Sequence, residues 1–125
     1  MSTEQEEKRF SIVRRAKSFI HAGRGIWLVM KTTHNAWIEV AVLLVAVVAG
    51  LYFRITQTDW MFIVFAAGLV LAAEAFNTAI EIDMDLTSPE YHPFARDTKD
   101  VAAGAVLIAA LAAAIIGVII FGPYV

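Results

Sequence analysis

The sequence has no cysteine, few charged residues and no strong excess of either charge. The missing cysteines exclude disulfide frameworks, thiolate nucleophiles and cysteine-ligated zinc or iron–sulfur centres. Charged residues make up 18% of the 125 positions, against about 25% in soluble domains, and the net charge of -2 offers no basic face for nucleic acid. Hydrophobic residues reach 59%, against about 45–50% in globular proteins. We therefore expect a single integral membrane domain over residues 1–125.

Three stretches are apolar enough to cross a bilayer as helices, over about residues 36–53, 60–84 and 99–121. The third is the cleanest, because Val101–Phe121 carries no charge. At about 1.5 Å per residue this stretch measures roughly 31 Å, which matches the hydrocarbon thickness of a bilayer. The second span continues beyond Ala73 into polar residues that still favour a helix.

The segment before the first span has a different pattern. Apolar residues such as Phe10, Val13, Phe19 and Trp27 recur at helical spacing, and most of the basic residues lie between them. This pattern predicts an amphipathic helix over about residues 6–33 that lies in the membrane interface.

The basic residues also predict an orientation. Seven of the ten Lys and Arg residues precede the first span, two lie between the second and third, and only Arg54 lies between the first and second. The positive-inside rule therefore places the N-terminus and the second loop in the cytoplasm, and the Arg54 loop and the C-terminus outside.

The second span carries polar side chains into the membrane, namely Glu74, Asn77, Thr78, Glu81 and Asp85. At about 100° per residue the three carboxylates fall within about 40° of one another. An intramembrane carboxylate costs at least ~2.5–3.5 kcal/mol on insertion scales, so a reason for it is expected. One interpretation is a polar seam that only holds helices together. The other is a site for a hard cation and proton transfer, since carboxylates suit Mg²⁺ and a buried carboxylate is a stronger base.

Lys99 and Asp100 stand directly before the third span, shortly after His92 and Pro93. The helix dipole disfavours a lysine near a helix start, so Lys99 favours an anion such as a nucleotide phosphate, which the free helix N–H groups would also bind. A lysine that only reaches the lipid headgroups is the alternative. Together with the carboxylates of the second span, Lys99 indicates phosphoryl transfer at the membrane surface.

Three motifs in order along the chain are K-S-F-I-H-A-G-R-G-I-W at 17–27, E-A-F-N-T-A-I-E at 74–81 followed by Asp85, and K-D-V-A-A-G-A-V at 99–106. In these motifs the sequence resembles the small prokaryotic diacylglycerol kinase and undecaprenol kinase family, over nearly its whole length. The resemblance implies an all-α lipid kinase of the bacterial cytoplasmic membrane, with three transmembrane helices and an interfacial helix. It also implies ATP as phosphate donor, Mg²⁺ as cofactor, and a homotrimeric bundle with composite sites between subunits.

The resemblance further implies a role for each matching residue. Glu74 is expected to be the general base, Asn77 to orient groups near the transferred phosphate, and Glu81 to hold Mg²⁺. Lys99 is expected to bind nucleotide phosphates and Asp100 to support the site. The residues that the resemblance assigns to nucleotide and cofactor binding are Arg14, His21, Glu81, Asp85 and Lys99.

Two positions depart from the family pattern. Family members usually carry a second glutamate near the metal at the position where this chain has Thr33. Glu39, Asp85 or a water molecule could take its place. Asp97 stands where many members have a small or apolar residue. Both departures concern the details of metal and nucleotide binding.

The first motif and the H-P pair before the third span look more like the undecaprenol kinases. The expected reaction is therefore undecaprenol to undecaprenyl phosphate, with diacylglycerol to phosphatidic acid as the alternative. An inactive family member, or a non-enzymatic oligomer such as a pore lined by Glu74 and Glu81, is the alternative of another class.

Overall fold

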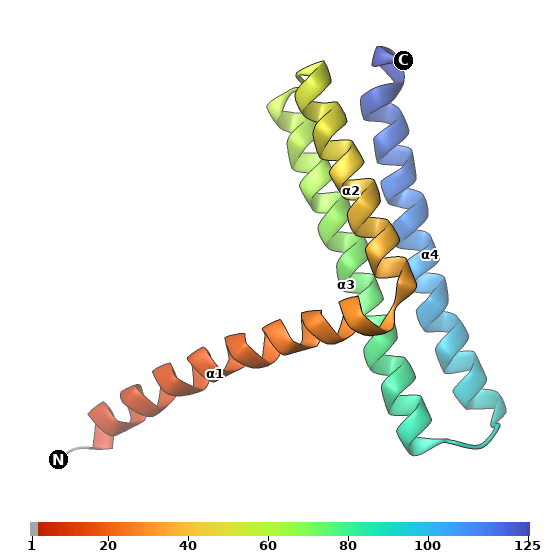
Figure 1. Ribbon diagram of the computed structural model, residues 1–125. Coiled ribbons are helices and arrows are strands. Elements are labelled where there is room, and N and C mark those ends of the chain that lie inside the picture. Colours follow the sequence, from red (N-terminus) through yellow and green to blue (C-terminus); the bar gives the residue numbers. More distant parts are fainter. Residues whose placement is uncertain (1–2) are drawn as a thin grey trace.

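The chain consists almost entirely of helices (Figure 1). The computed structural model describes residues 3–125 without the side chains of residues 5–10 and 34, so the predicted apolar position Phe10 lies outside the described side chains. Helix α1 spans Thr3–Thr32, α2 His34–Phe53, α3 Gln57–Thr87 and α4 Pro93–Phe121, and the short 3₁₀-helix η1 follows at Gly122–Tyr124. Helices α2, α3 and α4 stand side by side, whereas α1 projects from them at a steep angle.

Helices α2, α3 and α4 are each long and apolar enough to cross a membrane, over Asn35–Phe53, Gln57–Thr87 and Pro93–Tyr124. This confirms the predicted all-α membrane fold with three spans. Most large apolar side chains of these helices are exposed in the single chain, such as Val48 and Ile119. Such surfaces are suited to lipid tails or neighbouring subunits rather than to water.

The joint between α1 and α2 is a single residue, Thr33. Its backbone is extended, with φ -116° and ψ 118°, and this interrupts the helix. The Thr33 hydroxyl donates a hydrogen bond to the carbonyl of Val29. Val29 and Ala36, on either side of the joint, are buried, and the end of α1 packs against both α2 and α3. The joint therefore fixes where α1 leaves the bundle.

The turn between α2 and α3 is tight and well capped. Arg54 adopts the left-handed conformation, with φ 52° and ψ 55°. The Asp59 N–H donates to Thr56 Oγ1 at 3.2 Å, and the Thr56 N–H donates to Asp59 Oδ2 at 3.4 Å. This reciprocal pair is a capping box, which satisfies backbone donors that the first turn of α3 would otherwise leave free.

Helices α3 and α4 form the closest packed pair of the bundle and extend past the α1–α2 joint (Figure 1). Helix α4 begins at Pro93, well before the predicted start of the span at residue 99. The reason is local, because His92 caps the helix by accepting the Phe94 N–H on Nδ1 at 3.1 Å. Proline suits the first helical position, where its missing N–H has no partner to lose.

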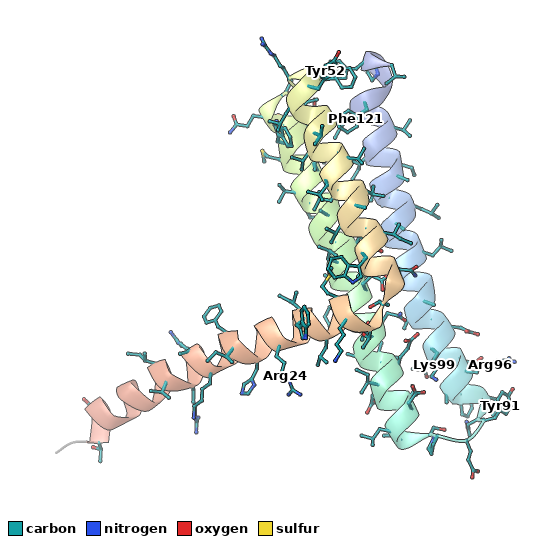
Figure 2. The ribbon with its side chains drawn as sticks, viewed as in Figure 1. Arg24, Tyr52, Tyr91, Arg96, Lys99 and Phe121 are labelled. Carbon is teal, nitrogen blue, oxygen red and sulfur yellow. The ribbon has the colours of Figure 1, made fainter. Side chains whose placement is uncertain are left out.

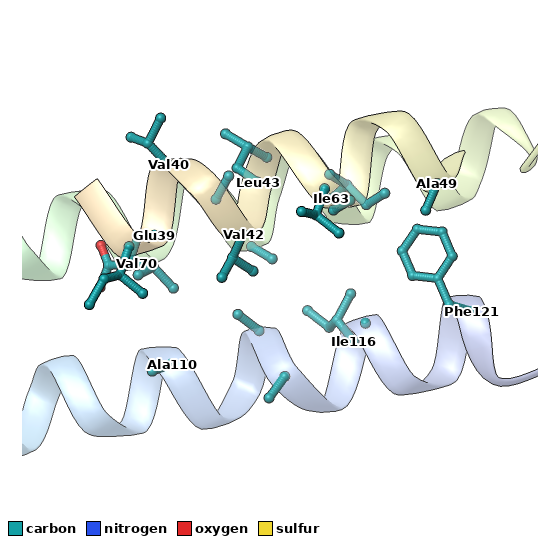
Figure 3. A pocket seen from close by; sticks show the side chains of 18 of the residues that line it. Glu39, Val40, Val42, Leu43, Ala49, Ile63, Val70, Ala110, Ile116 and Phe121 are labelled. Atoms are coloured by element: carbon teal, nitrogen blue, oxygen red, sulfur yellow. The ribbon is translucent and has the colours of Figure 1, made fainter. Parts of the chain in front are cut away.

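An apolar groove of about 570 Å³ separates α2 from α4, and α3 forms its floor (Figure 3). Leu43 of α2, Val70 of α3 and Ile116 of α4 are among the residues that line it. Among the described residues of its wall, Glu39, near the start of α2, is the one charged side chain. The groove therefore leads from the apolar part of the bundle to a carboxyl group.

Candidate active site

Three polar side chains are buried on one face of α3, beside the joint end of the bundle. Glu74 is 1% exposed, Asn77 9% and Thr78 7%, and each has a side-chain oxygen without a hydrogen-bond partner. Positions three and four residues apart share a helix face, so these groups lie together. Because buried polar groups in folded proteins are normally hydrogen-bonded, this cluster is suited to a polar ligand.

Glu39 of α2 joins this cluster. Glu74 of α3 acts electrostatically on the Glu39 carboxyl group, whose Oε2 atom also lacks a hydrogen-bond partner. We call Glu39, Glu74, Asn77 and Thr78 the buried tier. No definite partner for Glu39 could be predicted from the sequence, and the structure supplies Glu74.

A second group of polar residues lies farther along α3 and α4, beyond the α1–α2 joint. Lys99 Nζ lies 2.6 Å from Asp85 Oδ1, and Lys99 also interacts electrostatically with Glu81. Asp100 follows Lys99 on α4 and is exposed. We call Glu81, Asp85, Lys99 and Asp100 the exposed tier. The two tiers are roughly 10 Å apart along α3, from Glu74 to Glu81.

The single chain does not bring the two predicted α1 residues to either tier. Arg14 and His21 are exposed residues of α1, the helix that projects from the bundle (Figure 1). Of the eight predicted site residues, the structure buries Glu74 and Asn77 together on α3 and pairs Lys99 with Asp85, while Glu81 and Asp100 follow along the same two helices.

Comparison with known proteins identifies the family. The profile of the prokaryotic diacylglycerol kinases matches residues 20–121, which include both tiers. This chain belongs to the prokaryotic diacylglycerol kinase family. The undecaprenol kinase of Bacillus subtilis is 38% identical over 120 residues, covering 96% of this chain and 98% of the relative.

Other relatives within the same family are diacylglycerol kinases. The one from Synechocystis is 35% identical over 101 residues, which cover 80% of this chain and 58% of the relative. The one from Helicobacter pylori (strain 26695) is 28% identical over 106 residues, with coverages of 79% and 83%. Kinases of this family require a nucleotide phosphate donor and a lipid acceptor, and the three apolar helices make this chain a multi-pass membrane protein.

The exposed tier is compatible with Mg²⁺ of the kind a kinase uses. Among the described residues no three His, Asp or Glu side chains gather as a closed metal site. Mg²⁺ does not require one, since it usually takes one or two carboxylates and fills its other positions with water and substrate phosphates. Glu81 and Asp85 lie one helical turn apart and are exposed, so they fit such an open site. Thr33 belongs to the α1–α2 joint, where its hydroxyl donates a hydrogen bond to the Val29 carbonyl.

Lys99 differs in one respect from the expectation. Because α4 begins at Pro93, Lys99 lies in the second turn, and the free N–H groups of the helix start are not beside it. Its observed partner is the carboxylate of Asp85 on α3 instead. An anion at Lys99 would therefore be attracted by the charge of the lysine and not by the N–H groups of the helix terminus.

Sequence reasoning missed two contacts between helices. The Glu39–Glu74 pair joins α2 to α3, and the Lys99–Asp85 pair joins α3 to α4. A signal for the first existed, because a carboxylate within an apolar span needs a partner. The Lys99–Asp85 pair could not be predicted from nearby residues. Residues 85 and 99 come together only because the chain reverses direction between α3 and α4.

Proposed function

We propose that this protein transfers the γ-phosphoryl group of Mg-ATP to the hydroxyl group of a membrane lipid, at the cytoplasmic surface of the membrane. The observation that carries this proposal is Glu74, a carboxylate that is 1% exposed in a membrane-spanning helix and has an unpartnered oxygen. Burying such a group is costly, and proteins retain such groups where they bind or do chemistry.

In this mechanism the lipid hydroxyl binds at the buried tier and gives its proton to Glu74. The lipid oxygen forms a bond to the γ-phosphorus, the bond from that phosphorus to the bridging oxygen breaks, and ADP leaves. Asn77, with its unpartnered Oδ1 beside Glu74, orients the reacting groups. Phosphoryl transfer relies mainly on positioning and charge neutralisation, which a fixed polar cluster provides.

The exposed tier serves the nucleotide. Lys99 is partly exposed, so its ammonium group can exchange Asp85 for a phosphate oxygen without leaving water. Glu81 holds Mg²⁺, with Asp85 adjacent, and Asp100 supports Lys99. Bound Mg²⁺ would neutralise charge on the phosphate oxygens.

Arg14 and His21 complete the nucleotide site from another subunit. Both residues belong to α1, which projects from the bundle of α2, α3 and α4 (Figure 1), and this supports a composite site. The many exposed apolar side chains of α2, α3 and α4 provide surface for subunit contacts. We propose a homotrimer on the basis of the family resemblance.

Undecaprenol is the proposed acceptor and undecaprenyl phosphate the product. The 38% identity over nearly the whole chain to the undecaprenol kinase of Bacillus subtilis supports this choice. Diacylglycerol is the second candidate, since the other relatives carry that name at 35% and 28% identity.

The proposed orientation puts the N-terminus and the turn between α3 and α4 on the cytoplasmic side. Lys99 and Arg96 lie near that turn (Figure 2), and most other basic residues lie on α1. This arrangement obeys the positive-inside rule and places both tiers where cytoplasmic nucleotide can reach them.

The test is a radiolabelled phosphate-transfer assay on the purified protein in detergent or lipid cubic phase, with Mg-ATP and each lipid offered separately. Label in undecaprenol supports the proposal, and label only in diacylglycerol selects the second acceptor. Label in neither, from a folded and oligomeric sample, would favour an inactive relative. Thermal unfolding with Mg-ATP separates a pore from a kinase, because a ligand that binds only the folded state raises the unfolding temperature.

A further inference from the structure

We infer that the apolar groove between α2 and α4 holds one hydrocarbon chain of the lipid acceptor, and that aromatic rings at its far end limit the length of chain that it holds. The two ends of the groove differ in character (Figure 3). Glu39 lies at one end, and the ring of Phe121 lies between α4 and α2 at the other. The inference rests on the proposed function, which supplies a lipid with a hydroxyl group.

The end of the groove at Glu39 leads to the buried tier. Val70 of α3 lines the groove at this end, and Glu74 follows one helical turn later. Glu39 and Glu74 each have a buried oxygen without a hydrogen-bond partner, and buried acceptors in folded proteins are normally satisfied. A hydroxyl group at this end would satisfy one of them. A lipid alcohol, with one polar end and an apolar chain, therefore matches both parts of the groove.

Aromatic rings close the other end of the groove. Phe53 of α2 and Phe121 of α4 both line it there, and their ring centres are 6.4 Å apart. Tyr124 stacks on Phe53, with ring centres 5.1 Å apart and 24° between the ring planes. We call these three residues the ring cluster. Phe53 and Phe121 also pack against the buried isoleucines of this end, Ile55, Ile63 and Ile120. The ring cluster is thus held from several sides and forms a fixed wall.

The distance between the two ends sets the length of chain that fits. From Glu39 to Phe53, α2 rises roughly 21 Å at about 1.5 Å per residue. An extended chain advances about 1.2 Å per bond, so an isoprene unit with its four chain bonds takes roughly 5 Å. The groove therefore holds roughly four isoprene units. The remainder of a longer polyprenol lies in the bilayer.

The width of the groove favours a lipid chain over a helix of a second copy. Spread over roughly 21 Å, the 570 Å³ give a mean cross-section of roughly 27 Å². A helix with its side chains is about 10–12 Å wide, which corresponds to at least about 80 Å². The groove is open because small residues line α2 and α4, namely Ala46, Ala49, Ala110, Ala113, Ala114 and Gly117.

Photolabelling tests the occupant of the groove without catalysis. The probe is a linear primary alcohol of about sixteen carbons with a diazirine at the end of its chain, roughly 19 Å from the hydroxyl. With the purified protein in detergent, mass spectrometry should locate the label on the ring cluster, and undecaprenol should compete for it. Label spread evenly over exposed positions of α4 such as Val118 and Ile119 would overturn the inference. Absence of label from the ring cluster would also overturn it, because a second copy of the chain would then cover the groove.

Two neighbouring substitutions control this experiment. Ala114→Phe fills the groove and should lower labelling of the ring cluster at least about fivefold, because the ring occupies the space of the chain. Ile115 is 60% exposed and points away from the groove lining, so Ile115→Phe should leave the labelling unchanged. Equal labelling in the two variants, with both shown by thermal unfolding to be folded, would overturn the inference.

Kinetics test the length limit. KM for prenols, expressed as mole fraction in the detergent, should fall about threefold with each added isoprene unit up to roughly four units, because each unit adds contacts with the walls. Beyond that length KM should change less than about twofold. Phe121→Ala opens the far end, so KM should continue to fall with longer prenols. Tyr124→Ala, at a ring that is 42% exposed, is the milder second variant and should act in the same direction.

The same data show which idea fails. A KM that keeps falling beyond four units in the unsubstituted protein, or an unchanged length limit in both ring variants, would show that the ring cluster does not set the length. A protein that phosphorylates no prenol would refute the proposed acceptor, and the photolabel would still decide whether the groove holds a lipid chain.

Discussion

Lys99 of α4 and Asp85 of α3 form an ion pair with an Nζ–Oδ1 distance of 2.6 Å, and this pair joins the two helices beyond the α1–α2 joint. Both side chains are partly exposed, so water screens the attraction and the pair contributes little to folding. In the proposed function this pair keeps the Lys99 ammonium group near Glu81, on the side of the site assigned to the nucleotide.

The first prediction separates these two residues. Lys99→Met should lower the phosphate-transfer rate at least about 100-fold, because the transferred phosphoryl group loses a fixed positive charge. Asp85→Asn should have a much smaller effect on the rate, and neither substitution should change the unfolding temperature appreciably. Transfer assays and thermal unfolding on both variants check this. Unfolding of the Lys99 variant at a clearly lower temperature would point to a structural role.

The second prediction concerns the base. Glu74→Gln should abolish turnover, a loss of at least about 100-fold, while the unfolding temperature stays equal or rises. The reason for the second part is that a neutral amide is cheaper to bury than a carboxylate. Glu90→Gln, at an exposed position, is the matched control. Normal turnover in the Glu74 variant would remove this residue from the mechanism.

The third prediction concerns the close contact of α2 and α3. A Cβ atom at Gly50 would lie 2.7 Å and 2.8 Å from two ring carbons of Trp60. Gly50→Ala should therefore destabilise the fold, by about 1–3 kcal/mol, as an overpacked core position does. Phenylalanine lacks those ring carbons, so the double variant with Trp60→Phe should lose less than the two single changes together. Additive losses in chemical unfolding would show that the two residues do not clash.

The fourth prediction concerns the turn after α2. Arg54 has φ 52°, which L-residues with a Cβ atom adopt at a cost. Arg54→Gly should therefore remove a strain of about 1 kcal/mol from the folded state. Part of this gain is offset, because glycine loses more conformational entropy on folding than arginine does. Arg54→Ala keeps the strain and should give no such gain. An equal effect of the two variants in unfolding would assign the change to the lost charge.

The three spans were predictable because apolar runs of this length are typical of membrane helices, and the polar face of α3 was predictable because helical spacing is regular. The span predicted from about residue 99 lies inside α4, which begins at Pro93, because hydropathy marks the membrane span whereas the capping by His92 determines the helix start. The pairs Glu39–Glu74 and Lys99–Asp85 were not predicted, because each depends on how separate helices pack.

The fifth prediction tests the composite site. If Arg14 serves a nucleotide site on another subunit, inactive Arg14→Ala and inactive Glu74→Gln chains should restore activity when they are mixed and reassembled. Mixed trimers would then contain some sites with neither substitution. Mixing each variant with itself is the control. Activity no higher than that control, in samples shown to exchange subunits, would place Arg14 in the site of its own chain.

If α1 lies at the membrane surface as proposed, the single extended residue at Thr33 is the point where that surface helix meets the spanning bundle. A bundle in a thicker or thinner membrane would change its tilt while a helix held at the surface would not, so the resulting strain would fall on this packed joint. The buried tier stands beside the same joint. Turnover should therefore pass through a maximum as the acyl chains of the host lipid are lengthened, and lipid composition becomes a means of setting the rate.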